Sequence, residues 1–484
     1  MCNAAGNGIR EFLLEHAELS PVSFHMPGHK GSDIYKQYGY EAFLKKIMDC
    51  DITEICGADN LFQAEGIIKN VALKYEKLYR VKKSYLLVNG TSGGIIATVL
   101  ASVKQGGKLI MARNCHKAVF NAVRLGKMEP VYAYPSRLED YDISGPIEAE
   151  EIKNLLEKNP DAQAVILPSP NYYGICSDIK AIADVTHRFG KILIVDQAHG
   201  AHLNFMKGVP KSAEESGADI SINSTHKTLA SFTQSAVLNL NSDKIKIEDL
   251  EDKLQMTESS SPSYILMASL DVNADILINH GSELFERWQK NLEYFYEHVR
   301  EIKGVRIVNT GKFFDRTKIN IDMSAWGIDG MELEKRLIKK RIFCELTTGN
   351  ILMCMTGIGN TKEDMKILLN ALEEIAKSCE EDKKNITCYD EKGKNQRQEL
   401  KYKDIWNKKR RIYDFSGSKE LLNIDLCEGR ICASSVIPYP PGIPLICPGE
   451  IIERDDIEYV KNLRKTGQKV IGINDDDQIS VVFG

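Results

Sequence analysis

The stretch Asp219-Ile-Ser-Ile-Asn-Ser-Thr-His-Lys227 decides the expected fold class of this chain. Its first half places Ile220 and Ile222 on one face, which is the alternation typical of a β-strand. The strand leads into small hydroxyl residues, a histidine and a lysine. A lysine at the end of a strand lies at the edge of a sheet, where its amine can reach the aldehyde of a cofactor such as pyridoxal phosphate (PLP). A motif this short is also compatible with a solvated lysine, so other segments must decide.

Short apolar strands and helices alternate along the chain around this stretch. We expect strands at 84–88, 108–111, 164–167, 192–196 and 236–240, and helices at 95–103, 116–125 and 179–189. Such alternation predicts an α/β fold with a mainly parallel sheet, covered by helices on both faces.

Polar residues follow several of these strands, and ligands of parallel sheets bind beyond the carboxyl ends of the strands. Asp196 and Lys227 each end a strand, and the loop 114–116 follows another. The turn 89–94, Asn-Gly-Thr-Ser-Gly-Gly, leads into a helix, so its N–H groups suit an anion. The turn lacks both the Walker lysine and the G-x-G-x-x-G spacing, which argues against a nucleotide site. A purely structural turn remains the alternative.

The rest of the chain predicts further domains. We expect an N-terminal arm with substrate and interface loops at 1–65, a large PLP-binding domain at 66–265 and a small α+β domain at 266–380. A charged connector at 381–411 should precede a C-terminal domain at 412–484, whose Pro-rich stretch 436–450 predicts a rigid loop.

Composition limits the classes of function. The chain has 484 residues, 43% of them hydrophobic and 27% charged, as is usual for a globular protein. A net charge of -5 argues against a nucleic-acid partner. The 12 cysteines show no CxxC spacing, so we expect free thiols and no metal site. No apolar run approaches ~18 residues and no signal peptide is visible, which favours the cytoplasm and argues against membrane association.

Eight ordered motifs together resemble the Orn/Lys/Arg decarboxylase family, PLP enzymes with the aspartate-aminotransferase (type I) fold. The resemblance covers nearly the whole chain and is closest to the short branch without an N-terminal wing domain. The motifs are Phe24-His-Met-Pro-Gly-His-Lys-Gly31, Asp51-Ile-Thr-Glu54, Asn89-Gly-Thr-Ser-Gly-Gly94, Arg113-Asn-Cys-His-Lys117, Asp196-Gln-Ala-His199, Ser224-Thr-His-Lys227, Ser261-Pro-Ser-Tyr264 and Tyr439-Pro-Pro-Gly-Ile-Pro444 with Pro448-Gly-Glu450.

Two positions depart from the family pattern. Asn171 precedes the tyrosine where the family usually has threonine, and Gln197 occupies the variable position of the Asp-x-Ala-His motif. We expect neither side chain to touch an essential atom.

The resemblance implies a role for each motif residue. Lys227 would bind PLP covalently, and Asp196 would face the pyridine nitrogen; their separation, 227 − 196 = 31 residues, suits neighbouring strands joined by a helix. His116 and Ala198 would lie on opposite faces of the ring, and His199 would contact a cofactor oxygen or the substrate carboxylate. The phosphate would be held by Thr91, Ser92, Gly93, Ser224 and His226. Ser260 or Ser261 would reach it from a second subunit, which implies a homodimer or a higher oligomer.

The implied reaction is decarboxylation of arginine, lysine or ornithine to agmatine, cadaverine or putrescine, in polyamine metabolism. Lys227 or His226 would supply the proton to Cα. The distal cation of the substrate needs a carboxylate partner. The substrate candidates are His25, Asp51, Glu54, Asp59 and Glu345.

Two alternatives remain open at this point. One is a type I aminotransferase or C–S lyase, although no arginine for the substrate carboxylate can be assigned in the C-terminal part. The other is a catalytically silent regulatory homologue.

Overall fold

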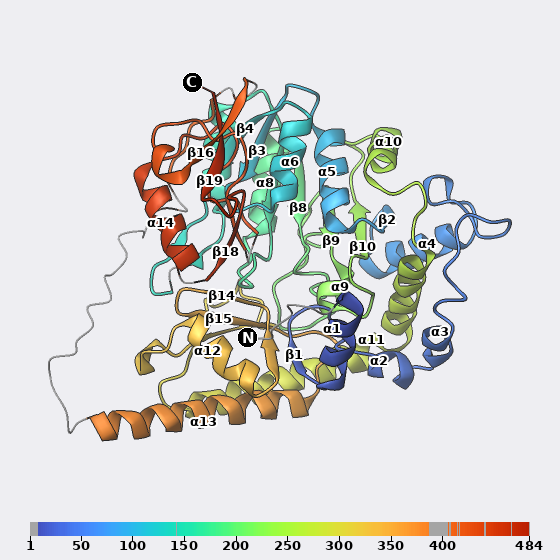
Figure 1. Ribbon diagram of the computed structural model, residues 1–484. Coiled ribbons are helices and arrows are strands. Elements are labelled where there is room, and N and C mark those ends of the chain that lie inside the picture. The colour runs from blue at the N-terminus through green and yellow to red at the C-terminus, as the bar shows by residue number, and fades with distance from the viewer. Residues whose placement is uncertain are drawn as a thin grey trace.

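A seven-stranded sheet forms the centre of the protein. The computed structural model describes residues 8–141, 143–386, 405, 408–413, 415, 417–439, 442–465 and 467–483. The strand order is β2-β10-β9-β8-β7-β3-β4 (Figure 1). The strands are β2 (Lys83–Leu87), β3 (Lys108–Ala112), β4 (Glu129–Ala133), β7 (Ala162–Pro168), β8 (Ile192–Asp196), β9 (Ile220–Asn223) and β10 (Ala236–Leu240). Only β10 runs antiparallel to its neighbours, so the expected mainly parallel sheet is confirmed.

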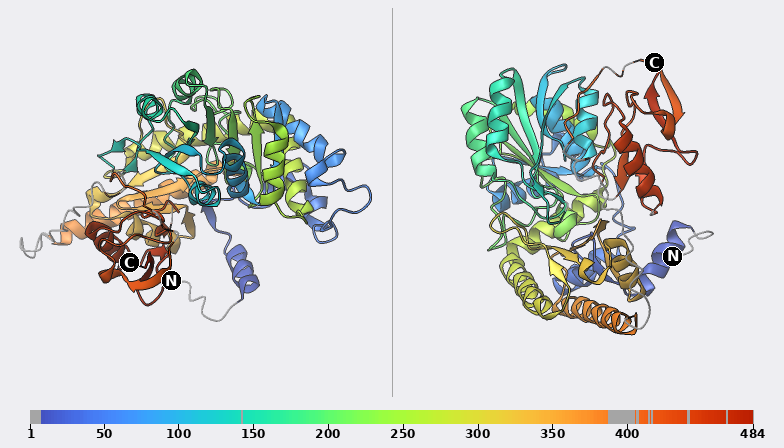
Figure 2. Two further views of the ribbon diagram at one scale, coloured as in Figure 1. Left: turned by 90° about the horizontal axis from the view of Figure 1, so that it is seen from above. Right: turned by 90° about the vertical axis from the view of Figure 1, so that its left-hand side faces the viewer.

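Helices cover both faces of this sheet, which explains why its strands are apolar throughout. On one face α5 (Gly90–Ser102) packs against α6 (Lys117–Leu125) and α10 (Ile247–Thr257). On the other face α7 (Ala149–Lys158) packs against α8 (Ile179–Arg188) (Figure 2). The run Leu193-Ile-Val195 of β8 is fully buried, as a strand with helices on both sides requires. The carboxyl edge of the sheet is therefore left to the connecting loops.

Helix α5 begins five residues earlier than the sequence predicted. The glycines of the turn 89–94 lie in its first turns, where they permit close packing. A Cβ at Gly94 would lie 2.5 Å from Leu87 Cδ1. The consequence is that the N–H groups of the first turn of a 13-residue helix point to the carboxyl edge of the sheet.

A smaller unit follows the long helix α11 (Tyr264–His298). Its antiparallel sheet has the order β11-β12-β15-β14, and helices α12 (Gly330–Lys339) and α13 (Lys362–Ile386) cover it. The strands are β11 (Arg306–Ile307), β12 (Lys318–Asp322), β14 (Leu346–Thr348) and β15 (Ile351–Met355). The N-terminal arm joins this unit, because β1 (Val22–Phe24) pairs in parallel with β13 (Ile342–Cys344).

The remaining N-terminal helices run along the outside of the molecule. They are α1 (Ile9–Glu18), α2 (Asp33–Gln37), α3 (Glu41–Lys45) and α4 (Ile67–Tyr79). After β4, the chain forms a short hairpin of β5 (Arg137–Leu138) and β6 (Ile143–Ser144). α1 buries none of its residues and projects from the body of the chain (Figure 2).

The C-terminal segment forms two small two-stranded antiparallel sheets and the helix α14 (Arg454–Lys465), and it packs beside the large sheet (Figure 2). One sheet pairs β16 (Lys419–Asn423) with β19 (Gln478–Val482), and the other pairs β17 (Ile437–Tyr439) with β18 (Lys469–Ile471). Most of the expected connector 381–411, together with Pro440 and Pro441 of the Pro-rich motif, lies outside the described residues. Within the described part, no helix combines the length and the apolar character that crossing a bilayer requires.

Candidate active site

A cavity of about 370 Å³ opens at the carboxyl edge of the large sheet. The N-terminal arm contributes Met26 to its wall, the small unit Glu345, and the C-terminal segment Tyr439 and Ile443. The sequence-predicted residues that line it are Thr91, Ser92, His116, Asp196, Ala198, His199, Ser224, His226, Lys227 and Glu345. The structure therefore brings together ten predicted residues from loops that are far apart in the sequence.

Lys227 lies in the one-turn helix α9 (Thr225–Thr228), directly after β9. Its Nζ is 2.9 Å from His199 Nε2, which can accept a hydrogen bond, and 5.6 Å from the centre of the Tyr172 ring. Burial lowers the pKa of Lys227, whereas the negative charges of Asp196 and Glu345 oppose that change. The environment therefore favours the neutral amine, which is the nucleophilic form.

Asp196 is the last residue of β8, and only 6% of it is exposed. Its Oδ1 accepts a hydrogen bond of 3.1 Å from the Ala198 N–H. Burial raises the pKa of Asp196, whereas Lys227 and the Ala198 N–H lower it. A buried carboxylate at the wall of a cavity is suited to a ligand atom that carries a positive charge or a proton.

Three neutral imidazoles surround the lysine. His116 caps α6 by accepting the Ala118 N–H at 3.2 Å, and burial lowers its pKa to about 3. His226 donates from Nδ1 to the Ser235 carbonyl at 2.9 Å, and burial lowers its pKa to about 4. Burial, Lys227 and Lys318 hold the pKa of His199 well below its usual value. None of the three carries a proton on both nitrogens near pH 7.

The N-terminus of α5 forms the end of the cavity that suits an anion. Thr91 Oγ1 lies 3.3 Å from Ser224 Oγ, so two hydroxyls from different elements meet there. Behind this turn, Glu258 Oε2 accepts the N–H groups of Val88 and Asn89, both at 2.9 Å. N–H groups, hydroxyls and a helix N-terminus form the set of donors that a phosphate requires.

Gly93 is not among the residues that line the cavity, so its contact with the phosphate stays a prediction. It lies inside α5, where a Cβ would come within 2.8 Å of Glu258 Oε1. Its role is to allow the helix to pack against that glutamate.

Glu345 enters the cavity because the edge strand is interrupted at this residue. Both the Glu345 N–H and the following residue, Leu346, face Met353 on β15, which is the arrangement of a β-bulge. Glu345 Oε2 accepts the Met26 N–H at 2.9 Å, which holds the carboxylate against the N-terminal arm.

The other candidate substrate residues lie elsewhere in this chain. The Asp59 carboxylate accepts the N–H groups of Asn60, Glu65, Gly66 and Ile68 at the start of α4, so its hydrogen-bonding capacity is used by the fold. The His25 Nδ1 bonds within its own loop, to the Met26 carbonyl at 2.5 Å. The two remaining substrate candidates, Asp51 and Glu54, and the two phosphate candidates, Ser260 and Ser261, are exposed on the surface. Contact of Ser260 or Ser261 with a second subunit stays a prediction.

Tyr172 is the main lining residue that the motif analysis missed. Its ring centre lies 4.4 Å from that of His199, so it forms a wall beside the lysine. Its position in a loop after a parallel strand, at the same edge as Asp196, was the available signal.

The two departures from the family pattern differ in position, because Asn171 lines the cavity and Gln197 does not. Asn171 Oδ1 accepts the N–H groups of Tyr173 and Ile175, which shapes the turn that carries Tyr172. Gln197 bonds to Glu214 and Asn223 in a buried network and does not line the cavity.

Residues 9–320 match the family model described as Orn/Lys/Arg decarboxylase, major domain, and residues 396–478 match the Orn/Lys/Arg decarboxylase, C-terminal domain. The chain belongs to the Orn/Lys/Arg decarboxylase family. The prediction that it is a decarboxylase is thereby confirmed.

Relatives within this family match over almost the whole of this chain. The arginine decarboxylase of Bacillus subtilis (strain 168) is 32% identical over 463 residues, covering 93% of this chain and 92% of the relative. The inducible lysine decarboxylase of Escherichia coli (strain K12) is 23% identical, covering 96% of this chain and 78% of the relative.

Solved structures confirm the type I fold of the decarboxylase. Lysine decarboxylase A from Pseudomonas aeruginosa superposes with a TM-score of 0.76 at 19% identity, covering 98% of this chain and 80% of that one. An alanine–glyoxylate aminotransferase from Nostoc sp. superposes with a TM-score of 0.55 at 16% identity, covering 69% of this chain and 92% of that one.

Proposed function

We propose that this protein decarboxylates a basic amino acid with the help of PLP. The observation that carries the proposal is the shared cavity of Lys227, Asp196 and Glu345. A reactive amine, a buried acid for a ring nitrogen and an acid for a distal cation lie around one space. The names of the family and of its arginine and lysine decarboxylases support the same class of substrate.

The residues present fit the cofactor. Lys227 would hold its aldehyde carbon, and the first turn of α5 with Thr91 and Ser224 would hold its phosphate. Asp196 would hold the pyridine nitrogen in its protonated form. His116 is fixed as a helix cap, so its flat neutral ring can lie against one face, while Ala198 is small enough to permit close approach on the other.

When bound, PLP supplies a ring that takes up the electron pair left as CO2 departs. The chain contributes burial, which keeps water away from the reacting carbon, and a proton donor for Cα. His226 is poorly suited to donate because its one proton is bound to the Ser235 carbonyl and its pKa is about 4. Lys227 is the better donor: its amine lines the cavity and is hydrogen-bonded to His199.

Glu345 would select the basic side chain of the substrate. Among the described residues that line the cavity, only Asp196 and Glu345 are carboxylates, and Asp196 lies at the sheet. The second oxygen of Glu345 remains available, because only Oε2 bonds to Met26. A charge-assisted hydrogen bond from an ammonium or guanidinium group would be the recognition contact.

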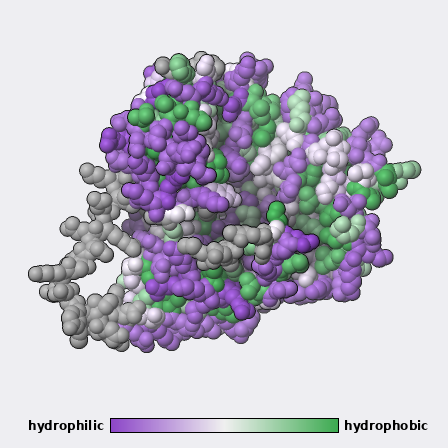
Figure 3. All heavy atoms as spheres, viewed as in Figure 1, coloured by the Kyte–Doolittle hydropathy of each residue, from purple (hydrophilic) through white to green (hydrophobic). Residues whose placement is uncertain are grey.

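A homodimer would bury hydrophobic side chains that are exposed in the single chain. The loop between α3 and α4 projects at the right edge of Figure 1, and its tip is hydrophobic in Figure 3. Met48 is 81% exposed there and Ile55 60%, and Ile67 nearby is 53% exposed. Burying such residues against a second copy is favourable. Sedimentation should show a dimer at micromolar concentration; a fully active monomer would contradict this part of the proposal.

The alternatives have less support. Among the described residues, no arginine lines the cavity, so the usual partner of an aminotransferase substrate's carboxylate is missing there. A silent homologue would not need Lys227, Asp196 and His116 around one cavity.

The test is to assay the purified protein, supplied with PLP, against arginine, lysine and ornithine. We expect CO2 and the corresponding amine from at least one of them. Lys227→Ala should abolish turnover, and Asp196→Asn should lower kcat about 10²- to 10³-fold. Borohydride reduction should attach the cofactor to Lys227. A keto acid as product, or attachment to another lysine, would refute the proposal.

A further inference from the structure

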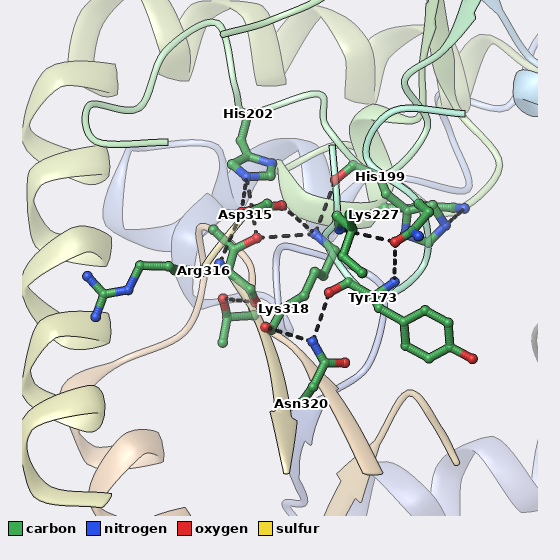
Figure 4. A network of polar contacts seen from close by, with 12 residues as sticks. Tyr173, His199, His202, Lys227, Asp315, Arg316, Lys318 and Asn320 are labelled. Atoms are coloured by element: carbon green, nitrogen blue, oxygen red, sulfur yellow. Dashed lines mark hydrogen bonds and ion pairs between the residues drawn. The ribbon is translucent and has the colours of Figure 1, made fainter. Parts of the chain in front are cut away.

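A second buried lysine lies next to the cavity without lining it. Lys318, the first residue of β12, has no exposed surface. Its Nζ donates to the His199 carbonyl at 3.1 Å, to Asp315 Oδ2 at 3.2 Å and to Thr317 Oγ1 at 3.1 Å (Figure 4). These three bonds use all three protons of an ammonium group. The small unit thereby holds the backbone of a cavity residue in the large domain.

Asp315 holds this lysine in place through an ion pair of 3.2 Å. Its Oδ1 lies 3.2 Å from His202 Nε2 and accepts the Thr317 N–H at 3.0 Å. Burial alone would raise the pKa of Asp315, but Lys318 and His202 hold it well below its usual value. A buried ion pair often contributes little to stability compared with an apolar pair of the same size. Its position beside the cavity therefore suggests a role in the site.

The same segment, residues 315–320, also holds the turn that carries Tyr172. The Asp315 N–H donates to the Gly174 carbonyl at 2.7 Å, and Asn320 Nδ2 donates to the Tyr173 carbonyl at 2.8 Å. Both acceptors belong to the turn that carries Tyr172, whose ring lies 4.4 Å from His199. Residues 315–320 thus bond to the His199 backbone and to the two residues that follow Tyr172, and the rings of His199 and Tyr172 both lie beside the Lys227 amine.

The charge of Lys318 also acts on the reactive lysine. After burial, Lys318 is among the causes that lower the pKa of both His199 and Lys227. A like charge nearby disfavours a second ammonium group. Two independent effects, backbone support and charge, therefore lead from Lys318 to Lys227.

We propose that Lys318, held by Asp315, is a positioning residue for Lys227. It fixes the His199 backbone, and with it the imidazole that contacts the Lys227 amine, and it places a buried positive charge near that amine. The inference rests on the proposed function only in taking Lys227 as the reactive lysine.

The test measures Lys227 itself in the full-length protein prepared without cofactor. Trace acetylation with acetic anhydride, read by peptide mass spectrometry across pH 6 to about 10, follows the neutral amine of Lys227. The variants are Lys318→Met and the double variant Asp315→Asn with Lys318→Met, which removes both buried charges together. Lys312→Met is the matched control, because Lys312 is an exposed lysine shortly before the same strand.

We expect the Lys227 labelling curve to move to higher pH in both variants and to stay unchanged in the control. With PLP restored, kcat should fall about a hundredfold in the double variant, as small misplacements of reacting groups produce, with KM changed much less. A folded double variant with the wild-type labelling curve would overturn the proposal. Failure of both variants to fold would also overturn it, by assigning the pair to stability. A shifted curve in a protein without decarboxylase activity would refute the proposed function and support this inference.

Discussion

Burial of charged groups determines the chemistry at the scale of single residues. Lys227, Asp196 and three histidines share one small space, and burial favours the uncharged form of each. The histidines can therefore contribute shape and lone pairs, whereas Glu345 contributes a carboxylate that is held by the Met26 N–H. This division makes the role of Glu345 separable from that of the reacting groups.

Replacing Glu345 should affect substrate recognition more than chemistry. Glu345→Gln keeps the shape and the hydrogen bond from Met26, but it removes the negative charge that would meet the distal cation. We expect KM for the preferred amino acid to rise about 10- to 100-fold, the equivalent of one charge-assisted hydrogen bond, with a smaller change in kcat. Steady-state kinetics against all three basic amino acids measure this. Glu363→Gln, in an exposed first turn of α13, is the control. An unchanged KM for every substrate would remove Glu345 from the site.

At the scale of elements, the strands at the centre of the sheet were predictable because their signal is local. β8 matches its expected range, and β9 lies within the opening stretch, since an apolar run followed by polar residues needs no distant partner. The bulge at Glu345 depends on pairing with Met353, and β1 pairs with a strand more than 300 residues away. Such long-range pairings leave no periodic pattern, so the sequence placed Asp59 and Glu345 in one group although only Glu345 lines the cavity.

The N-terminal Pro27-Gly28 turn forms a backbone clamp, meaning that Gly28 bonds both to the one-turn helix that carries Lys227 and to the small unit. Gly28 donates its N–H to the His226 carbonyl at 2.7 Å, and its carbonyl accepts the Gly359 N–H at 3.0 Å. A Cβ at Gly28 would lie 2.4 Å from the carbonyl carbon of Thr228. Gly28→Ala should therefore push α9 away and lower the free energy of unfolding by about 1–3 kcal/mol.

For Gly28→Ala, chemical denaturation measures the loss of stability, and kcat measures the displacement of Lys227. The matched control is Gly281→Ala in α11, where a Cβ would find its nearest neighbour, Phe285, at 3.8 Å. That change should be neutral or slightly stabilising, because alanine is the better helix former. If both variants kept wild-type stability and kcat, the clamp would have no role in placing Lys227.

Glu258, which accepts hydrogen bonds from the start of the Gly-rich turn 89–94, should make the stability of the protein depend on pH. Burial raises the pKa of Glu258 from 4.5 to about 7, while the N–H groups of Asn89 and Val88 oppose this. The value of 4.5 applies to the unfolded chain and the value of about 7 to the folded protein. Between pH 4.5 and about 7 the folded state therefore binds more protons than the unfolded state, so the contribution of Glu258 to stability falls as pH rises. Over this pH range the free energy of unfolding should fall by about 3 kcal/mol through Glu258, and this fall should be absent in Glu258→Gln.

Urea denaturation of both proteins at several pH values tests this. We expect the difference in unfolding free energy, wild type minus variant, to decrease from pH 4.5 to about 7 and to stay constant above. A difference that is independent of pH would show that Glu258 titrates normally.

At the scale of the whole molecule, the active site depends on how the C-terminal segment is attached. Arg113 lies just after β3 and is buried against that segment. It donates to the Pro444 carbonyl at 2.7 Å, to the Leu445 carbonyl at 3.0 Å and to Glu450 at 3.0 Å. Glu450 has no exposed surface, and Arg410 is its other charged neighbour, at 3.7 Å. One arginine therefore links the large domain to the Pro-rich loop that brings Tyr439 and Ile443 to the cavity.

Replacing Arg113 should loosen the attachment of the C-terminal segment without unfolding the large sheet. Arg113→Met leaves Glu450 buried with a weaker partner, which costs about 3–5 kcal/mol for a broken buried pair. The seven-stranded sheet should keep its fold, because its core is built mainly from its own helices and strands, and among the described residues Cys447 is the one buried core residue that the C-terminal segment contributes. The C-terminal segment should detach, so we expect faster trypsin cleavage after residues 408–411 and an increase in KM as the cavity loses one wall. Arg454→Met, at an arginine that is 72% exposed on α14, controls for the loss of a cationic side chain. Equal cleavage rates and KM values in both variants would show that the segment is held by its apolar contacts alone.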